Sequence, residues 1–146
     1  MVKTYGIVPY LILDNNPSIY VYKNKEGKYL FFKGKQEINE TKEQTAIREF
    51  FEETGYKVDE EYLERYFETK TKNKLIGLYL INSKNISFQL KNEKSKNIED
   101  IYEYIWIVCN VKLKNNFVKN QQTIFCMICN ELQKEKYKLI NKFFKG

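Results

Sequence analysis

Three glutamates are spaced so that their carboxylates would gather on one side of a helix. Glu49, Glu52 and Glu53 are related by steps of three and four residues, so on a helix they share a face. Like charges at these spacings repel each other, and a purely structural helix would usually interleave lysines. Clustered carboxylate oxygens instead suit a hard divalent cation, Mg²⁺ or Mn²⁺. The alternative is a helix face that is simply solvated.

The absence of histidine limits the chemistry open to this chain of 146 residues. A histidine general base, a Ser-His-Asp or Cys-His nucleophile system and a His-ligated zinc or haem are all excluded. Catalysis must therefore use carboxylate, lysine, tyrosine or cysteine groups, or a metal ion held by oxygen. The last possibility agrees with the glutamate cluster.

The glutamates belong to a longer pattern, over residues 34–56, that resembles the Nudix box. The fixed positions of the pattern are Gly34, Glu40, Arg48, Glu49, Phe50, Glu52, Glu53, Gly55 and Tyr56. So many fixed positions make the match specific. The resemblance implies a pyrophosphohydrolase that cleaves a nucleoside diphosphate linked to another group. It also implies an α/β/α sandwich with a mixed β-sheet.

The resemblance further implies a role for each charged residue of the box. Glu52 and Glu53 would be metal ligands, and Glu49 would be a ligand or the base that activates water. The carbonyl of Gly34 would complete the metal shell. A divalent cation would neutralise the phosphate charge and lower the pKa of its bound water, so no histidine is needed.

Arg48 would orient Glu49, and Glu40 would contact the metal-binding residues without binding the metal ion itself. The chain has only two arginines, at positions 48 and 65, among many lysines. An arginine inside the box therefore indicates a need for the planar fork that grips a carboxylate. The alternative for Arg48 is an ordinary helical ion pair with Glu52.

Residues 30–35, just before the box, resemble the same segment in diadenosine polyphosphate hydrolases and in mRNA-decapping Nudix enzymes. Phe32 replaces a proline that both groups commonly have, and Lys35 replaces the histidine that often follows the glycine in the diadenosine polyphosphate hydrolases. Lys33 and Lys35 could contact substrate phosphates as point charges. Exposed loop lysines are the alternative reading of both.

A further ligand or base is expected from a loop near the last predicted strand. The resemblance points to Glu99, with Asp100 and Glu103 as competitors and a surface charge as the alternative. Tyr79 and Trp106 are candidate platforms for a nucleobase, although core packing would also explain them.

Two cysteines, Cys126 and Cys129, form a Cys-x-x-Cys pattern in a segment that reads as helical. The segment lacks the strand-loop-helix context of a redox motif, and the chain has no second pair to build a zinc site. Buried packing is therefore the expected role of this pair.

The favoured substrate is a dinucleoside polyphosphate or a capped or triphosphorylated RNA 5′ end. Hydrolysis of damaged nucleoside triphosphates is the alternative activity, and a non-catalytic RNA-binding module with an inherited box is the alternative class. The formal net charge of +6 suits a nucleotide or RNA partner, although many lysines could be plain solvated surface.

Strands and helices must alternate to position the box. We expect strands at residues 5–13, 19–22, 29–32, 66–71, 75–81, 86–90 and 101–108, a loop at 91–100, and helices at 42–54 and 121–144. Thr41 and Gln44 form a capping box, and Gly55 suits a helix C-cap. Pro9 suggests an edge strand or a bulge. This order predicts a layered α/β domain.

The whole chain, residues 1–146, is expected to form a single domain. No apolar run is long enough for a membrane helix, and the N-terminus lacks the layout of a secretory signal. The three cysteines cannot all pair, which agrees with a reducing compartment. We therefore expect a cytoplasmic protein with no membrane partner.

Overall fold

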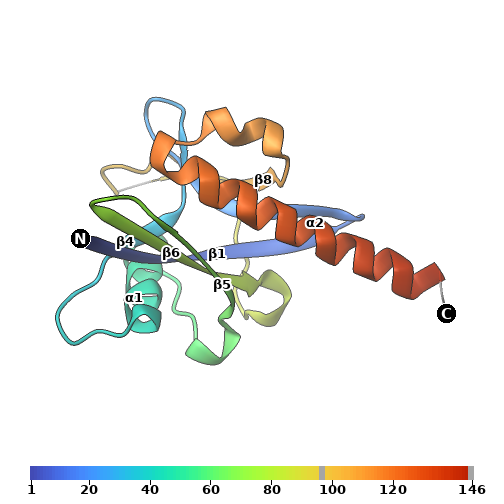
Figure 1. The fold of residues 1–146 in the computed structure, drawn as a ribbon, viewed down its shortest axis with the longest axis horizontal. Helices are drawn as coiled ribbons and strands as arrows, with labels where there is room; N and C mark the ends of the chain where they lie inside the picture. The colour runs from blue at the N-terminus through green and yellow to red at the C-terminus, as the bar shows by residue number, and fades with distance from the viewer. Residues whose placement is uncertain (96–97, 145–146) are drawn as a thin grey trace.

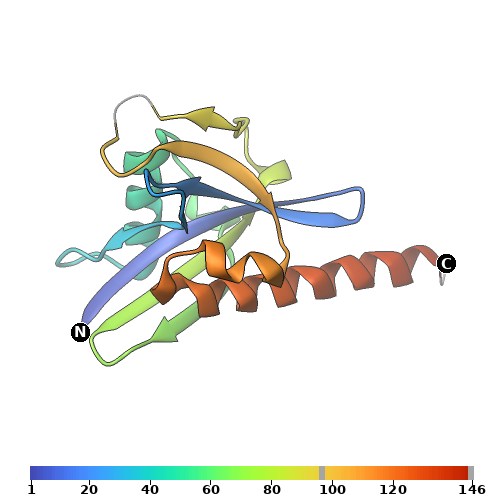
Figure 2. The ribbon, with the colours of Figure 1, turned by 90° about the horizontal axis from the view of Figure 1, so that it is seen from above.

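The computed structural model describes residues 1–95 and 98–144, with side chains described as far as residue 136. Eight strands form one mixed sheet, and two helices lie on its opposite faces (Figures 1 and 2). The strands are β1 (Val2–Leu13), β2 (Asn16–Lys23), β3 (Tyr29–Leu30), β4 (Phe32–Lys35), β5 (Glu64–Lys70), β6 (Lys74–Asn82), β7 (Glu93–Lys94) and β8 (Glu103–Val108). The helices are α1 (Lys42–Thr54) and α2 (Gln122–Phe144). The expected α/β/α sandwich with a mixed sheet is confirmed.

The sheet is built around β1. The main strand order is β5-β6-β1-β2-β8-β7, with β3 paired to β2 and β4 paired to β1. The pairing of β1 with β6 is parallel, and every other pairing is antiparallel. A parallel neighbour needs a long crossover, and residues 14–73 supply it by carrying the chain through α1.

Pro9 lies in this central strand, so the expectation of an edge strand is wrong. The side of β1 that faces away from β6 is shared by two strands. β4 pairs with residues 4–7, and β2 pairs with residues 10–13. Pro9 falls between these two pairings, where its missing N–H removes no antiparallel hydrogen bond.

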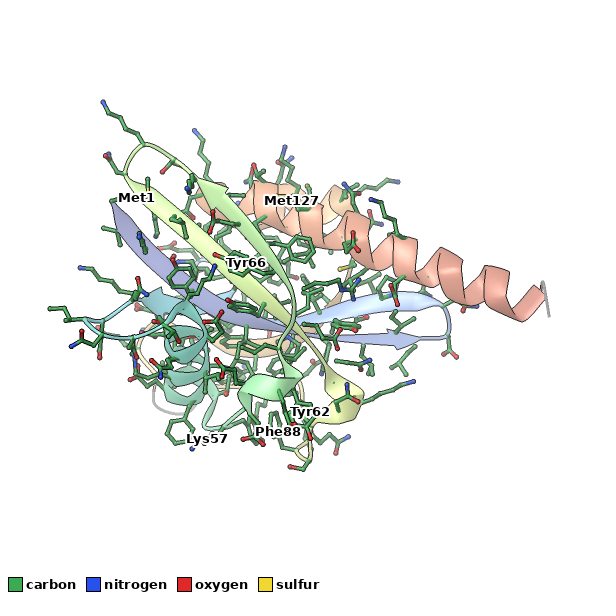
Figure 3. The ribbon with its side chains drawn as sticks, turned by 60° about the horizontal axis from the view of Figure 1, so that its bottom comes forward. Met1, Lys57, Tyr62, Tyr66, Phe88 and Met127 are labelled. Carbon is green, nitrogen blue, oxygen red and sulfur yellow. The ribbon has the colours of Figure 1, made fainter. Side chains whose placement is uncertain are left out.

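Two apolar cores lie on the two faces of the sheet, because successive side chains of a strand alternate between faces. On one face Tyr5 and Ile7 of β1 join Phe50 of α1 in a buried cluster. On the other face Val8 joins Phe125 of α2 in a second cluster. Met127 of α2 and Phe88 on the α1 side lie on opposite sides of the sheet in Figure 3.

α2 follows two short 3-10 turns and runs across one face of the sheet. Cys129 is buried in the core beneath it, with Cys109 beside it, and Cys126 is partly buried against the same core. The expected packing role of the Cys-x-x-Cys pair is therefore confirmed. Within residues 1–95 and 98–144, no helix is long and apolar enough to span a membrane.

The segment before β8 differs from the sequence-based expectation. Residues 86–90 form no strand, although Leu90 is buried and Phe88 stacks on Tyr56 with ring centroids 4.3 Å apart. The expected loop at 91–100 contains the two-residue strand β7, and its residues 96–97 lie outside the described part of the chain. The strand expected at residues 29–32 is instead two short strands, β3 and β4, which pair with different partners. The other expected strands and both helices are present with boundaries shifted by a few residues.

Candidate active site

Local signals fix both ends of α1. The Thr41 hydroxyl accepts the Gln44 backbone N–H at 3.1 Å, and the Gln44 side chain accepts the Thr41 N–H at 2.9 Å. At the other end Gly55 adopts a left-handed conformation with φ of 81°, and its N–H donates to the Phe51 carbonyl at 2.7 Å. These contacts satisfy backbone groups that a helix otherwise leaves unpaired. The box helix therefore has sharply defined ends.

The apolar side of α1 holds the helix against the sheet. Ala46 and Phe50 are fully buried, and the Phe50 ring meets the edge of Phe32 on β4 with centroids 5.6 Å apart. Burial of a ring of this size contributes about 2 kcal/mol. The adjoining side of the helix carries the glutamates of the box, as the sequence predicts.

Arg48 joins the charged residues of the box into one network. Its guanidinium donates to Glu40 at 2.7 and 3.0 Å, to Glu49 at 2.9 Å and to Glu52 at 3.2 Å. It also donates to the backbone carbonyl of Lys35 on β4 at 3.0 Å. The helical pair with Glu52 is thus present, but it is one bond among several. The planar fork uses its donors in a way that a lysine could not.

Glu40 is the anchor of this network. Besides its two bonds from Arg48, its carboxylate accepts the Thr45 hydroxyl and the Glu37 backbone N–H, each at 2.9 Å. These donors, the Arg48 bonds first, lower the pKa of Glu40 to about 2. Glu40 is therefore charged at any physiological pH and holds Arg48 in place.

Gly34 leaves room for the carboxyl group of Glu49. A Cβ atom built on Gly34 would overlap that carboxyl group. The close approach brings the backbone of β4 next to Glu49, as the resemblance implies for a shared metal shell. Burial raises the pKa of Glu49, and the charge and hydrogen bond of Arg48 oppose the rise.

Glu53 is the most deeply buried carboxylate of the cluster, and one of its oxygens has no partner. Among the described residues, its Oε2 is the only buried side-chain oxygen or nitrogen that lacks a hydrogen bond. Burial first, then the charge of Glu49, raises the pKa of Glu53 to about 8, against a hydrogen bond from the Lys33 backbone. An unpartnered buried acceptor is costly unless another group engages it.

A cleft of about 360 Å³ opens beside Glu52 and Glu53. Tyr20 of β2 and Tyr104 of β8 line it from the sheet, and the Tyr104 hydroxyl donates to the Glu53 backbone carbonyl at 2.6 Å. Tyr56 lines it after the end of α1. The cleft therefore combines carboxylates with aromatic faces.

The strand β7 adds Glu93 and Lys94 to the wall of this cleft. Sequence reasoning missed both residues, because a two-residue strand leaves no periodic signal. Glu99 lies elsewhere, in the lining of two neighbouring cavities that include Lys25. Glu93 therefore lines the same cleft as Glu52 and Glu53, and Glu99 does not.

Lys33 and Lys35 do not line the cleft. Lys33 pairs with Gly6 across β4 and β1, and alternation along β1 places Gly6 on the same face as Val8, the α2 side. Burial and the neighbouring charge of Lys74 lower the pKa of Lys33 to about 8. Lys35 is exposed, and its carbonyl accepts from Arg48.

The two aromatic candidates also lie outside the lining of the cleft. Tyr79 is buried, and its hydroxyl donates to Glu43 in the first turn of α1 at 2.6 Å. Trp106 donates its ring N–H to the Leu90 carbonyl at 2.9 Å. Both rings also pack in the core on the α1 side, which agrees with the alternative reading of each residue.

The metal-binding potential of the cluster rests on its donor set. Glu49, Glu52 and Glu53 offer carboxylate oxygens, which suit Mg²⁺ or Mn²⁺, and Glu53 Oε2 needs a partner. In the described part of the chain, no three acidic or cysteine side chains are grouped closely enough to hold an ion as they stand. Arg48 engages two of the three carboxylates. The residues therefore fit a hard cation once their side chains reorient.

Comparison with known proteins agrees with this site. The family described as the NUDIX domain matches residues 10–110. The C. elegans Ap4A hydrolase in a binary complex superposes with a TM-score of 0.61 and 17% identity, covering 90% of this chain and 98% of that one. The NUDIX domain of Shewanella oneidensis NrtR, complexed with ADP ribose, gives a TM-score of 0.63 and 15% identity, covering 94% and 88%. No curated protein sequence matches the chain.

An acidic helix with capped ends, packed on the mixed sheet of an α/β/α sandwich, is the arrangement of a class of phosphoanhydride hydrolases. The family match covers most of the sheet and all of α1, and the two solved structures share the fold over nearly the whole chain. The chain belongs to the Nudix family. It is accordingly a hydrolase of pyrophosphate bonds, as its box implies.

Proposed function

We propose that the chain is a metal-dependent pyrophosphohydrolase acting on a nucleotide derivative at the cleft beside α1. The observation that carries the proposal is the buried, unpartnered Oε2 of Glu53, next to two further carboxylates. A cation would supply the partner that this oxygen lacks. We assign Glu52 and Glu53 as metal ligands, with the Gly34 carbonyl as a further donor.

When bound, Mg²⁺ or Mn²⁺ would neutralise phosphate charge and make a bound water more acidic. The protein's own contribution is to hold the carboxylates in place. Arg48 binds Glu49 through Oε1 at 2.9 Å, so we assign Oε2 of Glu49 to bind the ion or to accept a proton from water. Glu40 fixes Arg48 in turn.

The extra acidic residue of the reaction is better assigned to Glu93 than to Glu99. Glu93 shares the cleft with Glu52 and Glu53, whereas Glu99 lines the neighbouring cavities. A second carboxylate group facing the cluster could bind a further cation or accept a proton. We therefore assign Glu99 to the neighbouring cavities and not to the carboxylate cluster.

The substrate class that fits the cleft is a dinucleoside polyphosphate. Tyr20, Tyr56 and Tyr104 line the cleft beside the carboxylates that would hold the phosphate-bound ion. Tyr56 is partly exposed and is the ring available to a base, whereas Tyr20 and Tyr104 are buried. The Ap4A hydrolase shares the fold of this chain, which supports the choice. An RNA 5′ end, ADP-ribose and a damaged nucleoside triphosphate are the competing substrates.

The assignment is tested by a Glu53→Gln variant in a Mg²⁺ assay with diadenosine tetraphosphate, capped RNA, nucleoside triphosphates and ADP-ribose. We expect turnover to fall at least about a hundredfold, because a metal ligand is lost. Thermal stability should be kept, because Gln has the size of Glu and the Oε2 atom that it replaces makes no hydrogen bond. Glu61→Gln, an exposed glutamate on the short turn before β5, is the control.

Wild-type turnover in the Glu53→Gln variant would refute the proposal. Salt-dependent RNA binding without turnover of any of these substrates would instead favour the non-catalytic class. Activity with one substrate alone would name the substrate directly.

A further inference from the structure

We propose that a second nucleoside phosphate binds in a groove beyond the cleft, lined by Lys25, Lys94, Ile98, Ile101 and Tyr102. We call it the distal groove. The inference rests on the proposed function, because it extends the substrate that would sit beside Glu53. It assigns the far half of a two-nucleoside substrate to residues outside the Nudix box.

The distal groove continues directly from the cleft. The two cavities, of about 360 Å³ each, share Lys94, Ser95 and Ile98 in their walls. A third cavity, of about 410 Å³, shares Lys25 and Glu99 with the distal groove. A ligand held at Glu53 can therefore extend past β7 without leaving the surface.

The lining of the distal groove suits an aromatic base with a phosphate attached. Tyr102 is 44% exposed, which is unusual for an aromatic residue of this chain, and it lines the groove. The Lys94 ammonium lies 5.4 Å from the centroid of that ring. Ile98 and Ile101 give the groove an apolar floor. Aromatic rings and cations in this combination bind nucleotides by stacking and by charge.

The charges along the surface follow the order of groups in such a ligand. The glutamates of the cleft come first, where a metal ion and the scissile phosphates would sit. Lys94 and Lys25 follow, where the remaining phosphates would lie. Glu99 lines both the distal groove and the third cavity, and Asp100 lines the third cavity. Carboxylates there would repel phosphate but accept hydrogen bonds from the hydroxyls of a ribose.

The walls of the distal groove are held in place without a ligand. The Tyr102 backbone N–H donates to the Lys23 carbonyl at 2.8 Å, and its carbonyl accepts from the Ser95 N–H at 3.0 Å. The turn that carries Lys25 is fixed by Asn24, whose side chain accepts the Lys28 backbone N–H at 2.9 Å. A preformed groove loses less conformational freedom on binding.

The test compares diadenosine tetraphosphate with ATP in Mg²⁺-dependent hydrolysis. In a Tyr102→Ala variant, the ratio of kcat/KM for the dinucleotide to that for ATP should fall about tenfold, because one stacked base is lost. The fall should appear in KM, because Tyr102 lies away from the reacting phosphates. Tyr102→Phe keeps the ring and should restore the ratio. Lys57→Ala, an exposed lysine outside the groove, is the control.

An unchanged ratio in Tyr102→Ala, or equal losses for both substrates, would overturn the distal groove while leaving the proposed function intact. Failure of the proposed function would appear differently, as no hydrolysis of either substrate by the wild type. In that event equilibrium binding of diadenosine tetraphosphate decides the question. Weaker binding to Tyr102→Ala than to Tyr102→Phe supports the groove, and equal binding refutes it.

Discussion

At the scale of single residues, Arg48 and Gly34 explain why the box needs those residue types. Arg48 binds three carboxylates and a backbone carbonyl, which requires a planar group with several donors. Gly34 is required for a steric reason, because the Glu49 carboxyl group occupies the space of a side chain. Within one motif, Arg48 therefore balances the charges of the carboxylates, and Gly34 leaves the space that the Glu49 carboxyl group occupies.

A Gly34→Ala variant should disturb Glu49 directly. The added methyl group overlaps the Glu49 carboxyl group, so we expect a loss of roughly 1–3 kcal/mol of unfolding free energy, from forced displacement of packed groups. Hydrolysis should fall with it. Urea unfolding and a Mg²⁺ assay measure the two effects. Lys35→Ala, at the next position, keeps the carbonyl that Arg48 uses and is the control. Wild-type behaviour of Gly34→Ala would contradict the close approach.

The residue-level site was partly predictable from the sequence. The Nudix box placed Arg48, Glu49 and Glu53 together because they share one helix, where spacing determines position. Glu93 could not be found in this way. Its place in the cleft depends on a short pairing between β7 and β8, which leaves no mark on the sequence around it.

At the scale of elements, α1 was predictable and the segment before β7 was not. The predicted bounds of the helix agree with Lys42–Thr54, because the capping box and Gly55 are signals read within a few residues. Ile86, Phe88 and Leu90 alternate with polar residues and so resemble a strand. They pack on the α1-side core from a loop, because no partner strand pairs with them.

Gly55→Ala tests how closely the end of α1 controls the site. With φ of 81°, alanine should cost about 1 kcal/mol of unfolding free energy. Because Gly55 also lines the cleft next to Glu53, hydrolysis should fall as well. Gly27→Ala is a matched control, because Gly27 has the same φ in a hairpin turn. Its unfolding free energy should fall similarly, but ATP hydrolysis should not. Equal losses of ATP hydrolysis in both variants would contradict a local effect.

At the scale of the whole molecule, the network around Glu40 contributes to acid stability. The pKa of Glu40 is about 2 in the folded protein and about 4.5 when the chain unfolds. Between pH 2 and pH 4.5 the unfolded chain therefore binds more protons than the folded protein. The stabilisation from Glu40 is complete above pH 4.5. It should be lost as the pH falls from 4.5 towards 2. Because Glu40 lies near the surface, solvent screening weakens this contribution, and the loss should be on the order of 1–2 kcal/mol.

Urea unfolding of the wild type and of Glu40→Gln between pH 7 and pH 3 measures this contribution. The difference in unfolding free energy between the two proteins should shrink as the pH falls, because a protonated Glu40 resembles glutamine. A difference that stays constant across this range would show that the pKa of Glu40 is ordinary.

The central strand β1 contributes side chains to both cores of the molecule. Its odd-numbered residues, such as Ile7, belong to the core under α1, and its even-numbered residues, such as Val8, belong to the core under α2. Loss of β1 would expose both cores, so we expect the two cores to unfold together. We therefore expect a substitution beneath α2, on the far side of the sheet from the carboxylates, to disturb the packing under α1 as well. Natural sequence variation in this strand must satisfy two sets of neighbours at adjacent positions.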